Sequence, residues 1–160
     1  MSLHNQSNQT NSQREIQLAS IVTNLPLPEG VTIRGWTEAD FPAIYALSEA
    51  EGWNSPRIPQ SQTLESWRNS WPVLVIVHEE TVIGFLRAMT DYAIATYIAD
   101  ILVAPGWQRQ GLGRALLEVC HQLTPLTHFV LMSVKEAVKF YEKDGFEHTI
   151  GFSKGFPLPG

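Results

Sequence analysis

Residues 103–117 read VAPGWQRQGLGRALL, and this stretch decides the fold. The apolar run 95–103 before it predicts a strand, and the residues after Gly111 predict an amphipathic helix because apolar side chains recur at spacings of three and four. Glycine permits a tight strand-to-helix turn with close backbone approach to a ligand, and a helix N-terminus presents free N–H groups at its positive end. The turn around Gly111 and Gly113 is therefore predicted to hold a phosphate group.

Other nucleotide-binding patterns fit this turn less well. The dinucleotide-binding fingerprint needs a third small residue where Leu116 stands, and it normally follows the first strand of a chain. The Walker loop needs Gly-Lys-Ser/Thr, which the sequence lacks. A plain strand-to-helix connection, in which the glycines serve packing alone, remains as the alternative.

The turn resembles the acetyl-coenzyme A pyrophosphate loop of the GNAT N-acetyltransferases, which reads Gln/Arg-x-x-Gly-x-Gly/Ala after a strand ending in Val-x-Pro. Gln108, Gly111 and Gly113 stand at the matching positions. A second match is AVKFYEKDGF at residues 137–146, which is similar to the Ala-x-x-x-Tyr-x-x-x-Gly-Phe signature that closes the core of that family. The resemblance covers nearly all of residues 31–156.

The expected fold class is α/β (α+β). The resemblance implies the GNAT fold, with a mixed sheet of six to seven strands that is splayed at its central strand and flanked by about four helices. Period-two and period-3.6 patterns predict the elements themselves. We expect a flexible tail over 1–29, of which residues 16–27 could lie on the body of the protein, and one N-acetyltransferase domain over 30–160. Strands are expected at 31–36, 73–78, 81–90, 95–103 and 129–132, with one or two more in 146–156; helices are expected at 37–51, 64–69, after the phosphate turn, and at 135–143.

The composition narrows the classes of protein. A chain of 160 residues with 44% hydrophobic content can bury one sizeable core, and a net charge of −5 does not suit a nucleic-acid partner. Cys120 is the only cysteine, which fits a reducing compartment. The sequence has neither an apolar run of about 18 residues nor a signal-peptide pattern, so we expect a cytoplasmic protein with no membrane partner. The five histidines lack metal-ligand spacing, so no metal is expected.

The cofactor implied by the resemblance is acetyl-coenzyme A. Its pantetheine arm is expected to pair with the backbone of a central strand, one N–H polarising the acetyl carbonyl, and its pyrophosphate to lie on the amides of the glycine turn. The family often has a cofactor-binding Asn where this chain has Val134, so no polar contact is expected there. The cofactor-binding candidates are Ile101, Leu102, Val103, Gln108, Arg109, Gln110, Gly111, Leu112, Gly113, Arg114, Ala137 and Phe140.

Two residues are candidates for catalysis. The resemblance assigns Tyr141 the protonation of the departing thiolate; the alternative is a packing residue on the apolar stripe of its helix.

The second candidate is Asp100. Strict alternation places Asp100 on one face of its strand with Ile98 and Leu102. A carboxylate in an apolar strand is expensive unless it is paired or functional, and a bulge that the family carries here could turn Asp100 to the cleft as the base for an ammonium substrate. The alternative is a structural Asp.

The leading hypothesis is an N-acetyltransferase in which a small-molecule primary amine attacks acetyl-coenzyme A directly. The segments Gly52-Trp53-Asn54, Arg87-Ala-Met-Thr-Asp91 and Phe152-Ser-Lys-Gly-Phe156 resemble the plant and cyanobacterial arylalkylamine branch of the family, which implies such an amine as acceptor. A homodimer is left open. The alternatives are an acyl-coenzyme A-binding sensor without chemistry and a protein or peptide N-acetyltransferase; the residues alone do not identify the acceptor. The resemblance also implies that the acceptor enters over the first helix of the domain and its following loop, and the acceptor-site candidates are Glu49, Trp53, Asn54 and Tyr97.

Overall fold

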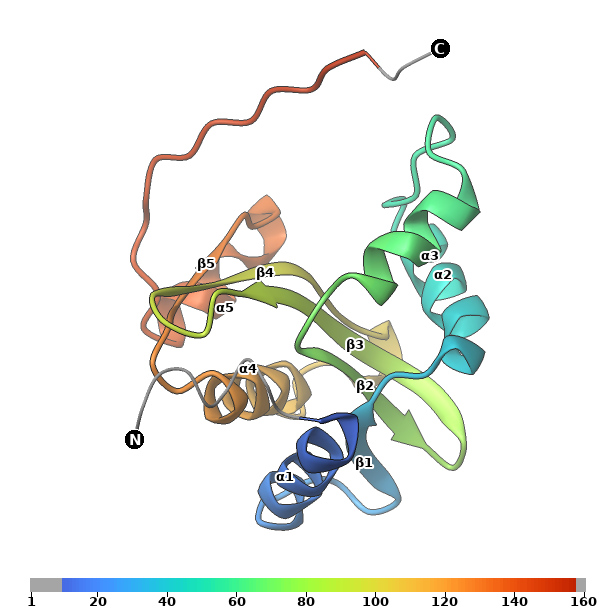
Figure 1. Cartoon of the computed structure of the whole chain (residues 1–160), viewed down its shortest axis with the longest axis vertical. Helices are drawn as coiled ribbons and strands as arrows, with labels where there is room; N and C mark the ends of the chain where they lie inside the picture. Colours follow the sequence, from blue (N-terminus) through green and yellow to red (C-terminus); the bar gives the residue numbers. More distant parts are fainter. Residues whose placement is uncertain (1–9, 158–160) are drawn as a thin grey trace.

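The computed structural model describes residues 10–157, which form one mixed sheet covered by helices on both faces (Figure 1). The strands lie in the order β1-β2-β3-β4-β5. Neighbours are antiparallel from β1 to β4, and β5 is parallel to β4. The strands are β1 (Val31–Gly35), β2 (Val73–His78), β3 (Thr81–Thr90), β4 (Ala95–Val103) and β5 (His128–Leu131).

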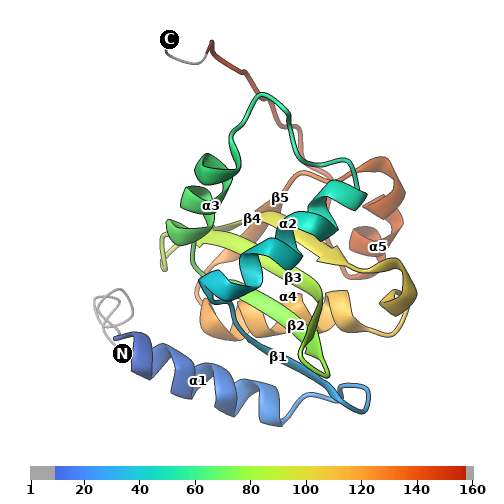
Figure 2. The same ribbon diagram turned by 90° about the vertical axis from the view of Figure 1, so that its right-hand side faces the viewer.

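The helices form two layers, one on each face of the sheet. Helices α1 (Asn11–Thr23) and α4 (Leu112–Leu123) cover one face, and α2 (Phe41–Ala50) and α3 (Gln60–Arg68) cover the other (Figure 2). Alternate side chains of a strand point to opposite faces of the sheet. Leu74 and Ile76 therefore pack in the hydrophobic cluster under α4, and Val73 and Val75 pack in the hydrophobic cluster under α2 and α3. The apolar period of α4 was predicted and is confirmed, because one stripe of that helix is buried.

A β-bulge at Ala99 interrupts β4. Arg87 on β3 faces Asp100, and the next residue, Ala88, faces Ile98, so Ala99 has no partner in the register. The extra residue shifts the alternation, and Ile98 therefore packs in the α4 cluster while Leu102 packs in the α2 and α3 cluster. The expectation that Ile98, Asp100 and Leu102 share one face is wrong for this reason.

Strands β4 and β5 diverge beyond the bulge. The parallel pairing covers Ala95 to Ile98 on β4, and it ends at Leu131 on β5. The second half of β4, from Ala99 to Val103, continues along β3 without β5 beside it. The splayed central strand that we expected is present, and the opening lies on the side of β4 that faces away from β3.

The N-terminal segment differs from the expected flexible tail over 1–29. Thr10 and Gln13 form a capping box, and α1 follows and packs on β1 and α4. Leu18 is buried, and the Arg14 guanidinium donates to the Tyr92 hydroxyl at 2.8 Å. Residues 11–23 are therefore helical, and the contact with the body that we allowed for residues 16–27 is present at Leu18, Ile21 and Val22; residues 1–9 lie outside the described part of the chain. Because of α1, the described residues contain five α-helices where about four were expected.

The end of the chain differs as well. After α5 (Val138–Lys143), residues 146–157 contain no strand, so the sheet has five strands where six to seven were expected. A period-two pattern is present in this segment, but a strand also needs a neighbour with which to form backbone hydrogen bonds, and no strand of the described residues pairs with it. In the part of the chain that the structure describes, no helix has both the length and the apolar character that a bilayer crossing demands.

Candidate functional site

The predicted phosphate turn joins the end of β4 to the start of α4. A short 3-10 turn, Pro105–Trp107, follows β4, and the Gln108 side chain then folds back to donate to the Val103 carbonyl at 2.9 Å. Arg109 has a φ of 62° and Gly111 a φ of 80°, so two residues in this short segment adopt left-handed backbone. Such turns bring successive N–H groups to one side, where they can surround an anion.

The N-terminus of α4 leaves its positive end uncompensated. Gly111 occupies the N-cap position, no side chain caps the helix, and its first turn holds no acidic residue. The first N–H groups of a helix have no acceptor within it, and they attract an anion. The twelve residues of α4 start at Leu112, so its free amides lie within the Arg109 to Arg114 segment that was expected to hold the pyrophosphate.

The two glycines of the turn serve different purposes. At Gly111 an added Cβ would meet no atom within 4 Å, so glycine is needed there for its left-handed φ. At Gly113 an added Cβ would lie 3.3 Å from the Phe140 ring, so glycine allows α5 to pack against the start of α4. Phe140, a predicted cofactor residue, therefore lies against the turn.

The two arginines of the turn also differ. The Arg114 Nε donates to the Asp144 carboxylate at 2.6 Å, an ion pair that ties α4 to the end of α5. Arg109 is exposed. Of the two side chains, Arg109 is therefore the better candidate for contact with a bound phosphate.

The open half of β4 presents backbone polar groups beside the turn. Ala104 donates its N–H to Ile83 on β3 at 2.8 Å. Because N–H and C=O groups alternate in direction along a strand, those of Ile101 and Val103 turn to the opposite side, where β5 has diverged. An extended ligand could add there as a strand does, with its anionic end at the N-terminus of α4.

Asp100 lies at the bulge and forms an ion pair that the sequence reasoning missed. The Arg87 Nε donates to its Oδ2 at 2.5 Å, and the same guanidinium donates to the Ser70 hydroxyl at 3.1 Å. The Asp100 side chain remains 29% exposed, so solvent reaches the carboxylate. The sequence does show an oppositely charged residue, Arg87, on the preceding strand. Its position directly across from Asp100, however, depends on the bulge.

Tyr141 is a buried residue of α5 in an aromatic group. Its ring makes edge contacts with Phe140 and Phe146, at centroid distances of 5.1 and 5.3 Å. Burial raises the pKa of the Tyr141 phenol to about 12. The phenol thus keeps its proton at neutral pH, as a proton donor must. Tyr141 also packs in the α4 cluster, which agrees with the alternative role of a packing residue.

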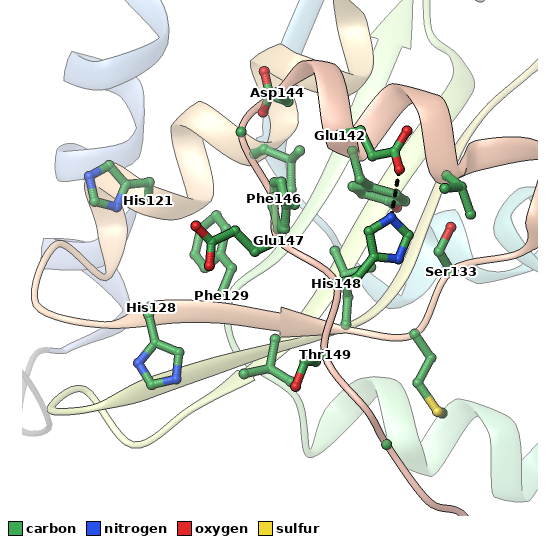
Figure 3. A pocket seen from close by; sticks show the side chains of 18 of the residues that line it. His121, His128, Phe129, Ser133, Glu142, Asp144, Phe146, Glu147, His148 and Thr149 are labelled. Carbon is green, nitrogen blue, oxygen red and sulfur yellow. Dashed lines mark hydrogen bonds and ion pairs between the residues drawn. The ribbon is translucent and has the colours of Figure 1, made fainter.

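A cavity of about 1220 Å³ lies beside Tyr141 (Figure 3). Its walls come from β5, α5, the outer side of α4 and residues 145–153, and the His148 ring lies 2.6 Å from the Glu142 carboxylate at its rim. None of the lining residues belongs to β4 or to the 108–113 segment. The cavity therefore adjoins the candidate cofactor site at Tyr141 and is not its main channel.

The acceptor-site candidates fall into two places. At the end of α2, the Asn54 amide donates to the Tyr45 carbonyl at 3.0 Å and to the Glu49 carboxylate at 2.8 Å, and Trp53 nearby is 41% exposed. Tyr97 lies on β4, in register with Met89 and Val130 on its two neighbours. The structure thus brings Glu49 and Asn54 together.

Within residues 10–157, no group of three or more His, Cys, Asp and Glu side chains is placed to hold a metal ion. Cys120 is buried, and burial raises the pKa of its thiol to about 12, so it carries no nucleophilic thiolate at neutral pH.

The sequence of this chain matches the family model described as Acetyltransferase (GNAT) domain over residues 69–148, half of the chain. That range includes the splayed strand, the phosphate turn, α4, β5 and α5.

Two plant proteins are similar over most of the described fold. "Histone acetyltransferase TAP1" of Glycine max is 31% identical over 125 residues, which cover 69% of this chain and 53% of that protein. "GCN5-related N-acetyltransferase 2, chloroplastic" of Arabidopsis thaliana is 28% identical over 144 residues, with 76% of this chain and 55% of that protein covered. The chain spans about half the length of the curated relatives it matches.

Two solved structures share the fold at lower identity. A GNAT family acetyltransferase from Streptococcus pneumoniae superposes with a TM-score of 0.64 at 20% identity, covering 78% of this chain and 99% of that one. Naa50 of Arabidopsis thaliana, in complex with the bisubstrate analogue CoA-Ac-MVNAL, gives a TM-score of 0.60 at 17% identity, covering 76% and 85%.

Proposed function

This chain belongs to the GNAT acetyltransferase family, and from that premise we propose that it transfers the acetyl group of acetyl-coenzyme A to a primary amine. The observation that supports this most is the continuity of two features: the open half of β4 leads into an α4 N-terminus without a compensating charge. Together they suit a ligand that is extended at one end and anionic at the other. Acetyl-coenzyme A is such a ligand, and the Naa50 relative carries a coenzyme A derivative.

The proposed cofactor contacts follow the direction of the strand. The pyrophosphate lies on the amides of Arg109 to Arg114, with the Arg109 side chain adding charge. The pantetheine arm pairs with Ile101 and Val103 on the open side of β4, and Leu102 holds the strand against β3. Ala137 and Phe140 bring α5 to the same place, since Phe140 packs on Gly113.

The proposed reaction is a direct attack in a ternary complex. The amine nitrogen bonds to the acetyl carbon, the carbonyl oxygen gains negative charge, and the amide of Ile101 stabilises it. The carbon–sulfur bond then breaks, and the thiolate receives a proton as it departs. Tyr141 is the proposed donor because its phenol stays protonated and α5 packs beside the turn.

The amine also loses a proton, and Asp100 is the proposed base. It lies on the open half of β4 and is partly exposed, so it can take the proton directly or through a water molecule. Its ion pair with Arg87 works against this role, because a protonated Asp100 would lose the attraction of the guanidinium. Asp100 could therefore act by orienting the strand instead, and the two roles differ in their pH dependence.

A small amine, such as an arylalkylamine, is the proposed acceptor, with Glu49, Trp53, Asn54 and Tyr97 as candidate contacts. A protein or peptide amine is the second candidate because one relative is named a histone acetyltransferase and Naa50 carries a peptide-bearing analogue. Release of free thiol from acetyl-coenzyme A, measured over small amines, arylalkylamines, polyamines and peptides, tests both. Tight acetyl-coenzyme A binding with no thiol release for any class would favour the non-catalytic sensor.

We propose a reducing compartment for the protein. Its single cysteine, which the structure buries in α4, fits such a compartment. The expected cytoplasm is one, and the plastid stroma is another; one relative carries the word chloroplastic in its name.

A further inference from the structure

The phosphate turn, residues 105–113, is held to the body of the protein at both of its ends. At its α4 end the Leu112 side chain is buried. At the end that follows β4, Trp107 is the one residue of 105–111 that is not exposed, and it packs against the α4 cluster. The Trp107 N–H donates to the Ala104 carbonyl at 2.8 Å, which closes the 3-10 turn. Trp107 therefore anchors the β4 end of the phosphate turn.

Trp107 contacts a histidine from a different part of the chain. The centroid of the His78 ring lies 4.6 Å from that of the Trp107 ring, and the two planes make an angle of 47°. His78 ends β2, a strand whose other residues are all buried. It points to the α4 side of the sheet, as Leu74 and Ile76 do, because alternate residues of a strand share a face. The contact thus ties the phosphate turn to a strand that is fixed in the core.

The backbone at Gly30 leaves room for the His78 ring. Gly30 belongs to the turn between α1 and β1, where it has a φ of 73°. A Cβ added there would lie 3.2 Å from both Cδ2 and Nε2 of His78, which is closer than ordinary van der Waals contact. The imidazole has backbone close to its edge and the Trp107 ring against it, so it has little freedom to rotate. A side chain whose rotamer is fixed by packing can hold the residue that it touches in place.

We propose that His78 is a positioning residue for the cofactor site. By packing on Trp107, its ring holds the phosphate turn in the conformation whose free amides bind the pyrophosphate. The imidazole acts through Trp107 and needs no contact with the cofactor. The apparent affinity for a ligand falls with the fraction of molecules in which the site is formed, so a loosened turn weakens binding and leaves the later steps unchanged. The identity of the ligand rests on the proposed function, whereas the state of the turn can be measured without any ligand.

The first experiment measures amide hydrogen exchange in the protein without cofactor. The Trp107 N–H, bonded to the Ala104 carbonyl, reports on the turn, and the Ile76 N–H reports on β2. Loss of one aromatic contact in His78→Ala should speed exchange at Trp107 by about five- to tenfold and leave exchange at Ile76 unchanged. Unchanged exchange at Trp107 would overturn the proposal. Equal acceleration at Ile76 would also overturn it, because His78 would then stabilise the fold as a whole.

Two further variants test whether the aromatic contact is the cause. His78→Phe keeps a ring on Trp107 and should restore the wild-type exchange rate there. His121→Ala is the matched control, because it removes another imidazole in an aromatic contact. The His121 ring lies 6.1 Å from the Phe129 ring, in the last turn of α4, and its loss should leave exchange at Trp107 unchanged. If either His78→Phe or His121→Ala exchanges as fast as His78→Ala, the contact with Trp107 is not what holds the turn and the proposal is wrong.

The second experiment measures the reaction with two acetyl donors. With acetyl-coenzyme A, His78→Ala should raise KM by about five- to tenfold and leave kcat unchanged, since only the formation of the site is altered. With S-acetylpantetheine, which has no pyrophosphate, kcat/KM should be the same for His78→Ala and wild type. An equal loss with both donors would overturn the proposal. A wild type that does not use acetyl-coenzyme A would reject the proposed function instead, and exchange at Trp107 would still decide the role of His78.

Discussion

The Arg87 Nε lies 2.5 Å from the Asp100 Oδ2, across strands β3 and β4 at the point where the bulge begins. The pair places a carboxylate next to the opening of the sheet and holds it in one orientation. It also makes two roles for Asp100 separable, because a base must give up the pair when it takes a proton, whereas an orienting residue keeps it.

The first prediction concerns Asp100→Asn, which keeps the shape and removes the base. If Asp100 takes the proton, kcat/KM for an alkylamine should fall by roughly 10²-fold at pH 7 and by much less at pH 9.5, where more of the substrate is already neutral. Initial rates of thiol release at the two pH values measure this. Ser70→Ala removes the hydroxyl bonded to Arg87 and leaves the ion pair, so it serves as the control. Equal losses at both pH values would assign Asp100 an orienting role.

The second prediction concerns Tyr141→Phe. The ring keeps its contacts with Phe140 and Phe146, so the melting temperature and the acetyl-coenzyme A affinity should hardly change, while kcat should fall by roughly 10²-fold. Because burial raises the pKa of Tyr141 to about 12, the wild-type rate should show no loss from this phenol up to pH 10. Single-turnover rates test the chemical step. Tyr92→Phe, which alters a hydroxyl bonded to Arg14, is the control; an unchanged rate for Tyr141→Phe would make Tyr141 a packing residue.

The third prediction separates the two glycines near the turn. Gly111→Ala forces a side chain into a φ of 80° and should weaken acetyl-coenzyme A binding by at least about tenfold, because a strained turn cannot hold its amides in place. Gly106→Ala is the matched control: its backbone is not left-handed and a Cβ there also meets nothing within 4 Å. Calorimetric titration measures both. Equal affinities for the two variants would place the phosphates elsewhere.

The fourth prediction concerns stability and pH. Asp40 is buried at the start of α2 and accepts two bonds from Arg34 on β1, at 2.8 Å each. Burial raises the pKa of Asp40, but the bonds from Arg34 and Thr37 outweigh it and hold the pKa below its usual value. A depressed pKa contributes stability above the unfolded value of about 3.9, and this is lost as the pH falls through the folded value.

Asp40→Asn should therefore lower the free energy of unfolding by about 1–3 kcal/mol at pH 7, and the difference from wild type should shrink below about pH 4. Urea titrations at pH 7 and pH 3 measure it. Glu38→Gln changes an exposed carboxylate paired with Arg68 and is the control, with a small effect at both pH values. A constant difference between wild type and Asp40→Asn across this range would exclude the proposed pH linkage.

The strands and helix at the centre of the sheet were predictable from the sequence, and two parts near the ends of the chain were not. The β2 to β4 strands and α4 carry dense apolar repeats, and they form where expected. Helix α1 was not predicted because polar residues separate the apolar side chains that it buries. These apolar residues are Leu18, Ile21 and Val22 in the helix and Leu25 just after it. The strands expected in 146–156 are absent because an alternating pattern states a local preference, whereas pairing depends on a neighbour.

The candidate site was predictable where its residues are adjacent in the chain. The turn from Gln108 to Gly113 requires only local conformation, and the expected strand-to-helix turn is present, with α4 starting at Leu112. The partner of Asp100 depends on the register between two strands, and that register changes at Ala99. Neither the extra residue nor Arg87 opposite the carboxylate can be read from a single strand.

The bulge at Ala99 changes which residues of β4, even-numbered or odd-numbered, face α4. On β4 before it, even-numbered residues such as Thr96 and Ile98 face α4; after it, the odd-numbered Ile101 and Val103 do. The side chains that pack on the α4 side accordingly change from even to odd numbers at Ala99, while the even-numbered Leu102 is buried in the layer of α2 and α3. Deletion of Ala99 would give β4 one continuous alternation, with Ile98 and Ile101 still on the α4 side and Leu102 still in the other layer. The single extra residue Ala99 thus separates two halves of β4. The first half pairs with strands on both sides, and the second half leaves its outer side open.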